Sequence, residues 1–171
     1  MYAYELLYRN GDTPTANVDN MNPFSGDAAT SSVITQLFTN LDMETILGNK
    51  RAFINFTHNH LVQQIPNLLP KERIVIEVLE TVKIDQNLIK NLIALNKLGY
   101  KIALDDFIYR DELKPLIEIA DIIKIDVLNL NKDQIARQLD PLSHFRGKLL
   151  AEKIEDKNQF GHCVDLGFHF F

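Results

Sequence analysis

The sequence has a single cysteine, Cys163, among its 171 residues, so it has no intrachain disulfide framework. This usage is typical of a reducing compartment, and we predict a cytoplasmic protein. No apolar run approaches the roughly 20 residues of a membrane span, and residues 1–10 lack the basic and apolar segments of a signal peptide. A formal net charge of −5 argues against a broad surface for a nucleic acid polymer. We therefore expect partners other than membranes and nucleic acid polymers.

What the sequence does have is a regular alternation of strand-like and helix-like segments. The clearest helical pattern lies between Asp85, a plausible N-cap, and Gly99, a plausible C-terminal stop. Short apolar runs predict strands at 2–9, 51–57, 73–80, 101–107, 121–127, 148–154 and 168–171. Further helices are predicted at about 27–40, 58–65, 111–119, 131–139 and 156–166.

This alternation predicts βαβ units in a parallel sheet, which is either an open doubly wound sheet or a barrel. The segment 9–27 is rich in Gly, Pro, Asn and Asp and is predicted to be a loop. No linker or internal repeat divides the chain, so we expect one domain over residues 1–171. The last segment still reads as a strand, which indicates a barrel that is truncated and continues in a longer protein.

Polar and charged residues fall in or near the carboxyl-terminal halves of six successive predicted strands, the end where parallel α/β folds form their sites. They are Glu5, Asn55, Glu77, Glu80, Asp105, Asp106, Lys124, Asp126, Glu152 and Glu155. Oxygen ligands of this kind suit Mg²⁺ or Mn²⁺ better than zinc. Two such cations can activate water for a phosphodiester displacement, and a neighbouring lysine can offset phosphate charge. Taken singly, each acid is also compatible with a helix cap or loop, and Glu155 with the start of a helix.

The pieces "ELLYR", "INFT", "EVLET", "LDDF", "KID" and "AEKIE" resemble, in order and approximate spacing, the motifs of EAL domains. These are bacterial phosphodiesterases that open cyclic di-GMP to the linear dinucleotide pGpG. The resemblance covers essentially the whole chain. It implies a modified (β/α) barrel of the TIM type with the first strand antiparallel to its neighbours, here truncated to about seven strands.

The resemblance also implies a role for each residue of the motifs. Arg9 corresponds to an arginine that contacts ligand phosphate, and Lys124 and Glu152 correspond to the catalytic lysine and to the glutamate that assists the hydrolytic water. Glu80 corresponds to a glutamate that steadies the loop after the acidic pair. The implied ligands of two Mg²⁺ or Mn²⁺ ions are Glu5, Asn55, Glu77, Asp105, Asp106 and Asp126.

The chain departs from the family pattern at several positions. Ile108 and Tyr109 stand in a loop where flexible or small residues are usual, and that loop couples metal binding to dimerisation in the family. Leu79 replaces a threonine, and Lys153 replaces a glycine after Glu152. The stretch between Arg9 and Asn55 is shorter than usual, and a Gln-Gly-Tyr motif after the seventh strand is absent.

Two interpretations remain open at this stage. The first is a metal-dependent cyclic di-GMP phosphodiesterase. The second is a catalytically inactive EAL-like module that binds cyclic di-GMP or a protein partner and regulates an attached domain. The motifs "ELLYR" and "AEKIE" resemble those of degenerate EAL domains that precede an HDOD domain, which implies a C-terminal HDOD domain. The family resemblance also implies a homodimer.

Overall fold

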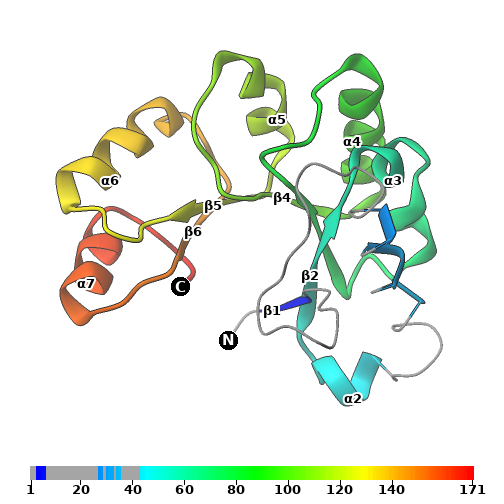
Figure 1. Cartoon of the computed structure of the whole chain (residues 1–171), viewed down its shortest axis with the longest axis horizontal. Coiled ribbons are helices and arrows are strands. Elements are labelled where there is room, and N and C mark those ends of the chain that lie inside the picture. Colours follow the sequence, from blue (N-terminus) through cyan, green and yellow to red (C-terminus); the bar gives the residue numbers. More distant parts are fainter. Residues whose placement is uncertain (1–2, 7–26, 29, 33, 36–42) are drawn as a thin grey trace.

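The structure, a computed structural model, describes residues 3–6, 27–28, 30–32, 34–35 and 43–171. Within them, a six-stranded sheet runs in the order β1-β2-β3-β4-β5-β6, and every neighbouring pair is parallel. The strands are β1 (Ala3–Leu6), β2 (Arg51–Phe56), β3 (Ile74–Val78), β4 (Lys101–Leu104), β5 (Ile122–Asp126) and β6 (Lys148–Glu152). The sheet curls, and the helices between successive strands lie along its convex side (Figure 1). This is part of a barrel of the predicted TIM type.

The helices cover the connections from one strand to the next. They are α2 (Met43–Leu47), α3 (His58–Val62), α4 (Gln86–Leu98), α5 (Lys114–Ile119), α6 (Lys132–Leu139) and α7 (Lys157–Asp165), with short 3₁₀ turns η1 (Ile65–Leu68), η2 (Asp111–Leu113) and η3 (Asp140–Leu142). The described residues between 27 and 35 are helical as well, as predicted. Helix α2 was not predicted.

The start and end of α4 follow the sequence signals. The Asp85 carboxylate accepts a hydrogen bond from the Leu88 amide at 2.9 Å, and Gly99 adopts a left-handed φ of +98°. Leu88, Leu92 and Leu95 are fully buried against the sheet. These leucines lie on one stripe of the helix, and their burial is the main force that holds α4 in place.

The prediction of an antiparallel first strand is wrong for β1. Ala3, Tyr4, Glu5 and Leu6 pair in parallel register with Arg51 to Ile54 of β2. Antiparallel neighbours are usually joined by short hairpins, whereas the connection from residue 7 to residue 50 is long enough for a crossover that returns the chain to the same end of the sheet. The direction of β1 brings Glu5 to the end of the sheet that carries the other acids.

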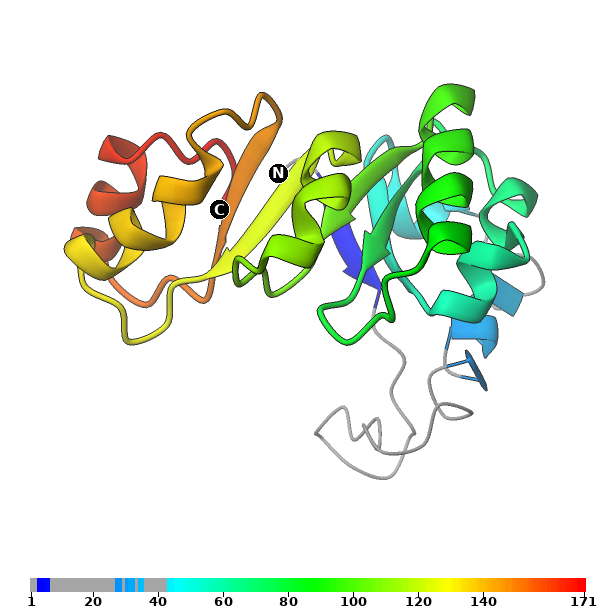
Figure 2. The same cartoon turned by 90° about the horizontal axis from the view of Figure 1, so that it is seen from above.

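The predicted seventh strand is reduced to a single bridge. Phe170 pairs in parallel with Leu150, its carbonyl oxygen accepting a hydrogen bond from the Ala151 amide at 2.9 Å, and the His169 amide donates to the Leu149 carbonyl oxygen. The segment therefore follows the edge of β6 without forming a ladder of its own. Figure 2 shows the strands as one continuous twisted sheet, with the end of the chain beside β6.

The two faces of the sheet are packed differently. The convex face and the helices form the larger core, which includes Phe56, Ile76 and Leu92. On the concave face, Phe53, Val75, Ala103 and Ile122 form a separate apolar layer, with Ala3, Leu150 and Phe170 packed against it. Of the described helices, none is long and apolar enough to cross a membrane.

Candidate functional site

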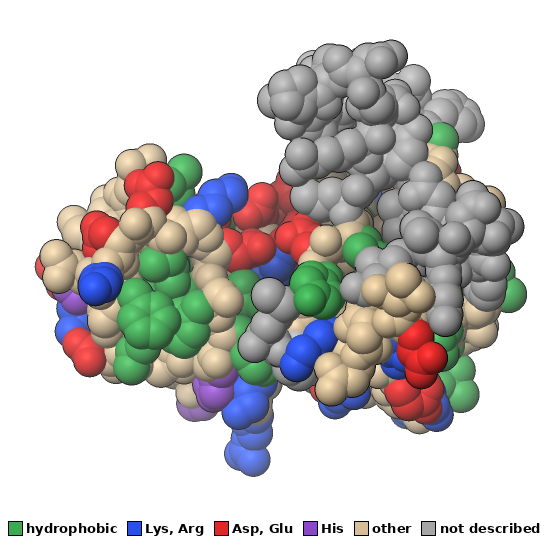
Figure 3. Space-filling view, turned by 90° about the horizontal axis from the view of Figure 1, so that it is seen from below, with side chains coloured by type: hydrophobic (Ala, Val, Ile, Leu, Met, Phe, Trp, Pro, Cys, Tyr) green, Lys and Arg blue, Asp and Glu red, His purple; other side chains and the backbone are tan. Residues whose placement is uncertain are grey.

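The candidate site lies directly above the apolar layer of the concave face. Side chains of a strand alternate between its two faces, so a residue two positions after a member of that layer faces the same side, nearer the carboxyl end. Adding two to Ala3, Phe53, Val75, Ala103, Ile122 and Leu150 gives Glu5, Asn55, Glu77, Asp105, Lys124 and Glu152. Six adjacent strands thus direct one polar residue each toward a common point. Figure 3 shows acidic side chains gathered around a basic one in a hollow of this face.

Lys124 lies at the centre of this group, with a side chain only 3% exposed. Its Nζ donates to Glu77 Oε1, to Asp105 Oδ1 at 2.7 Å and to Glu152 Oε1 at 2.8 Å, and lies 3.7 Å from Glu5 Oε2. One ammonium therefore faces four carboxylates. Four acids around one ammonium in a half-closed site are favourable only if protons or further cations offset the excess of negative charge.

Two buried oxygens show where a cation fits. Glu77 Oε2 and Asn55 Oδ1 are buried and have no hydrogen-bond partner in the described part of the chain. Asn55 and Glu77 are register partners on β2 and β3, and carboxylate oxygens of Glu5, Glu77 and Asp105 lie within 4.8 Å of one another. Carboxylate and amide oxygens are the ligands that Mg²⁺ and Mn²⁺ prefer. The oxygens of these four residues fit a divalent cation. Together with Lys124 and Glu152 they form what we call the inner half of the site.

The electrostatics of the inner half follow from burial. Burial raises the pKa of the Glu77 carboxyl to about 8, although the Lys124 ammonium opposes the shift. Burial also raises the pKa of Glu152, again against Lys124. For Lys124 burial acts to lower the pKa, but the carboxylates of Glu77 and Asp105 outweigh it and raise the pKa. Lys124 is therefore a permanent cation in this site.

Asp126 and Lys153 form the outer half of the site. Asp126 ends β5, and Asp126 Oδ2 accepts a hydrogen bond from Lys153 Nζ at 2.5 Å. Asp126 Oδ1 accepts one from the Leu128 amide at 2.8 Å. Burial acts to raise the pKa of Asp126, but these two hydrogen bonds outweigh it and lower the pKa. Lys153, where the family pattern has glycine, adopts a left-handed φ of +58°.

The loop that follows β4 contains Asp106 and contacts the segment that follows β3. Asp106 has a positive φ of +39°, and carboxylate oxygens of Glu80, Asp105 and Asp106 lie within 4.8 Å of one another. Glu80 contacts the loop with its backbone: the Glu80 carbonyl oxygen accepts a hydrogen bond from Arg110 Nη2 at 3.2 Å. Ile108, in the same loop, is 70% exposed.

An apolar cavity of about 290 Å³ adjoins the acidic pair. It lies between the loops that follow β3 and β4, and its walls include Val82, Ile84, Ile108, Asp105 and Asp106. A larger open cavity of about 870 Å³ lies at the opposite, amino-terminal edge of the sheet, where Lys101 and Lys148 line it. None of the residues of the inner half lines that larger cavity, whereas Asp105 lines the smaller one. The smaller cavity is therefore the one that a ligand of the site can reach.

The structure brings together most of the residues that the sequence pointed to. Glu5, Asn55, Glu77, Asp105, Lys124 and Glu152 meet at the inner half, and Asp106, Asp126 and Glu80 lie around it. Glu155 lies outside both halves, in the turn that leads into α7, where its amide donates to Gln159 Oε1. Arg9 lies outside the described residues.

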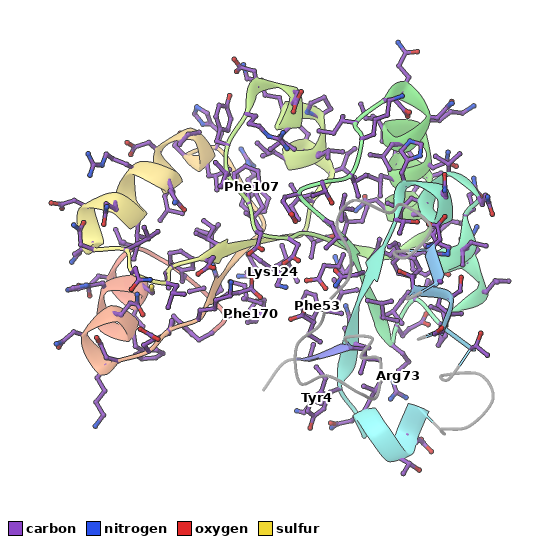
Figure 4. The ribbon with its side chains drawn as sticks, viewed as in Figure 1. Tyr4, Phe53, Arg73, Phe107, Lys124 and Phe170 are labelled. Atoms are coloured by element: carbon purple, nitrogen blue, oxygen red, sulfur yellow. The ribbon has the colours of Figure 1, made fainter. Side chains whose placement is uncertain are left out.

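One residue that the sequence reasoning missed is Phe53. The ring centroid of Phe53 lies 5.8 Å from Lys124 Nζ, within the range of a cation–π contact. Figure 4 shows both side chains on the concave side of the sheet, with Phe107 on the side of the helices. The alternation of β2 is the signal that could have found it, because Phe53 precedes Asn55 by two positions.

The chain resembles two curated proteins over nearly its whole length, although no family model matches it. It is 33% identical over 170 residues to the cyclic di-GMP phosphodiesterase CdgJ of Vibrio cholerae, covering 98% of this chain and 38% of that protein. It is 34% identical over 175 residues to the uncharacterized protein YuxH of Bacillus subtilis, covering 99% and 41%. The chain spans about two fifths of the length of these relatives.

Solved EAL domains share the fold. The YkuI protein of Bacillus subtilis, which has an EAL domain and was solved with cyclic di-GMP and calcium, superimposes with a TM-score of 0.70 at 18% identity, covering 96% of this chain and 48% of that one. The EAL domain of Mycobacterium smegmatis DcpA gives 0.65 at 20% identity, covering 89% and 77%. The resemblance to EAL domains that the six ordered motifs predicted is thus confirmed in the fold, and the sequence comparison adds a relative that is a cyclic di-GMP phosphodiesterase.

Proposed function

We propose that this chain is an EAL-type domain that hydrolyses cyclic di-GMP to linear pGpG in bacterial signalling. The observation that carries the proposal is the inner half of the site, where one buried ammonium faces four carboxylates and two buried oxygens lack partners. A phosphodiester substrate with a divalent cation completes this charge pattern. The relationship to CdgJ, a cyclic di-GMP phosphodiesterase, supports the same substrate.

The residues of the inner half have three tasks in the proposed reaction: to hold the cation, to accept a proton and to stabilise the phosphate. Glu5, Asn55, Glu77 and Asp105 would hold a divalent cation, which would supply Lewis acidity to the reaction. Glu152 accepts the proton of the attacking water as the water oxygen bonds to phosphorus; the P–O bond to one ribose 3′ oxygen breaks, and that oxygen takes up a proton from solvent to become the free hydroxyl of pGpG. Burial raises the pKa of Glu152, which makes its carboxylate a stronger base.

Lys124 acts on the phosphate rather than on the water. Its pKa is raised, so it remains an ammonium and stabilises the negative charge that develops on the phosphate oxygens. The apolar cavity beside Asp105 and Asp106 offers walls for a purine base. Arg9, at the end of the "ELLYR" motif, is proposed to contact phosphate as the resemblance implies.

A second candidate function is a catalytically inactive module that binds cyclic di-GMP or a protein partner and relays this to an attached domain. The observation that favours it is the engagement of Asp126 by Lys153, because this carboxylate is an implied ligand of a metal. A following HDOD domain, a homodimer and a cytoplasmic location remain predictions from the sequence.

The experiment that separates the two functions is a time course with cyclic di-GMP and Mn²⁺, followed by chromatography of the nucleotides. The phosphodiesterase produces pGpG only with the metal, and Glu5→Gln abolishes the product. Asp165→Asn is the matched control. Asp165 is the last residue of α7 and forms an exposed ion pair with Lys132, so this variant should retain full activity.

The inactive module gives a different result. It forms no pGpG over hours but binds cyclic di-GMP in calorimetry, and Glu5→Gln weakens that binding in the presence of Mn²⁺. A protein that neither hydrolyses nor binds cyclic di-GMP would contradict both functions.

A further inference from the structure

The Lys153 ammonium lies against the carboxylate of Asp126, the last residue of β5. Its Nζ lies 2.5 Å from Asp126 Oδ2, while the Leu128 amide holds Asp126 Oδ1. Both carboxylate oxygens of Asp126 therefore have a donor within the chain. The pKa of Lys153 is raised by the hydrogen bond to Asp126 and further by the charges of Asp126, Asp106 and Glu152. The ammonium thus lies in the field of three acids.

The inner half of the site differs in this respect. Glu77 is fully buried, and its Oε2 has no partner among the described residues, as is also true of Asn55 Oδ1. A divalent cation can bind there without displacing any hydrogen bond of those two atoms. A cation that binds Asp126 must first displace the Lys153 ammonium, which stays near Asp126 because it is attached to the same chain.

We propose that Lys153 replaces one of the two divalent cations that the resemblance implies, so that the chain holds one metal ion at the inner half. The ammonium supplies a fixed positive charge beside Asp126, and Glu5, Asn55, Glu77 and Asp105 bind the single ion. This inference rests on the proposed function, because it concerns the metal content of the same site.

Backbone geometry supports a specific role for this position. A left-handed φ is unfavourable for a residue with a Cβ and easy for glycine, yet Lys153 adopts +58°. The side chain gains an ion pair in return, although at 53% exposure that pair contributes little to stability. The main effect of the substitution is therefore on which cations the site accepts.

The test is the number of Mn²⁺ ions bound per chain, measured by calorimetry and by electron paramagnetic resonance. The wild type is expected to bind one ion with the spectrum of isolated Mn²⁺. Lys153→Met removes the charge and keeps the length of the side chain, and Lys153→Gly restores the residue of the family pattern. Both variants are expected to bind a second ion about tenfold more tightly than the wild type, because the positive charge of Lys153 no longer repels it.

The second ion has a spectroscopic signature. Two ions about 3.5–4 Å apart give the spectrum of a spin-coupled pair, which should appear in both Lys153 variants. Lys132→Met is the matched control, since it removes an equal charge from an exposed pair with Asp165, and it should bind one ion like the wild type.

Two results would overturn the inference while leaving the proposed function intact: a coupled pair in the wild type, or a single ion in both Lys153 variants. Absence of any bound Mn²⁺ in the wild type and the variants would contradict the proposed function itself, and the inference with it.

Discussion

The two halves of the site are built from the same residue types but differ in how their oxygens are satisfied. In the inner half, Glu77 and Asn55 each keep one buried oxygen without a partner. In the outer half, Asp126 has both oxygens engaged, by Lys153 and by the Leu128 amide. Glu77 of the inner half is fully buried, whereas the Lys153 side chain is 53% exposed.

This difference shows that the presence of acids does not by itself define a metal site. A cation binds where its ligands lack other partners and where water is excluded, since electrostatic interactions are stronger there. Metal binding is therefore expected at the inner half.

The largest effect is expected for Lys124→Met in metal-free protein. The substitution leaves Glu77, Asp105 and Glu152 close together without their common counter-ion. Removing one member of a buried ion pair costs about 3–5 kcal/mol of unfolding free energy. Urea unfolding in the presence of a chelator measures this loss, and a loss below about 1 kcal/mol would mean that water already solvates the acids.

A double variant refines the same comparison. Glu77→Leu combined with Lys124→Met removes a buried charge together with its partner, so the double variant should be more stable than the sum of the single losses predicts. We expect a coupling of about 2 kcal/mol. Additive losses would show that the two side chains do not interact.

A second, intermediate effect concerns pH. Because the pKa of Glu77 is about 8 in the folded chain and 4.5 ordinarily, the folded state binds more protons between these values. The unfolding free energy of the metal-free protein should therefore fall as pH rises from about 4.5 to about 8. Divalent cations compete with that proton, so the affinity for Mn²⁺ should rise by up to about tenfold per pH unit below pH 8.

Calorimetric titration with Mn²⁺ across this pH range checks the prediction. Glu77→Gln cannot titrate, and we expect it to bind Mn²⁺ more weakly and with a flatter pH dependence. An unchanged pH dependence in Glu77→Gln would place the titrating ligand elsewhere.

The smallest effect is expected for the stability of the outer half. Lys153→Gly loses an exposed ion pair, worth about 0–1 kcal/mol, and gains relief from the left-handed φ at that position. We expect a metal-free unfolding free energy within about 1 kcal/mol of the wild type. Lys153→Ala loses the ion pair without relief of the backbone and should be less stable than Lys153→Gly in the same thermal melts.

The sequence predicted the parallel sheet and most of the inner half for a simple physical reason. Strand alternation and apolar periodicity are local, so a polar residue two positions after an apolar strand residue can be located without a structure, as for Asn55 and Glu77. Helix α4 was predicted closely for the same reason, through its cap at Asp85 and its stop at Gly99.

Long-range features were beyond the sequence patterns. The parallel direction of β1 depends on pairing between Glu5 and Phe53, far apart in the chain. The hydrogen bond of Lys153 to Asp126 likewise joins the ends of two strands, and from the sequence Lys153 could equally compete for a carboxylate or extend into solvent. The single bridge at Phe170 depends on packing against β6.

The most direct test of the account is anomalous diffraction at the manganese edge from crystals of this chain with Mn²⁺ and cyclic di-GMP. The account predicts a strong peak bounded by Asn55, Glu77 and Asp105, with the Lys153 ammonium still on Asp126. A peak beside Asp126 with the inner half empty would contradict it.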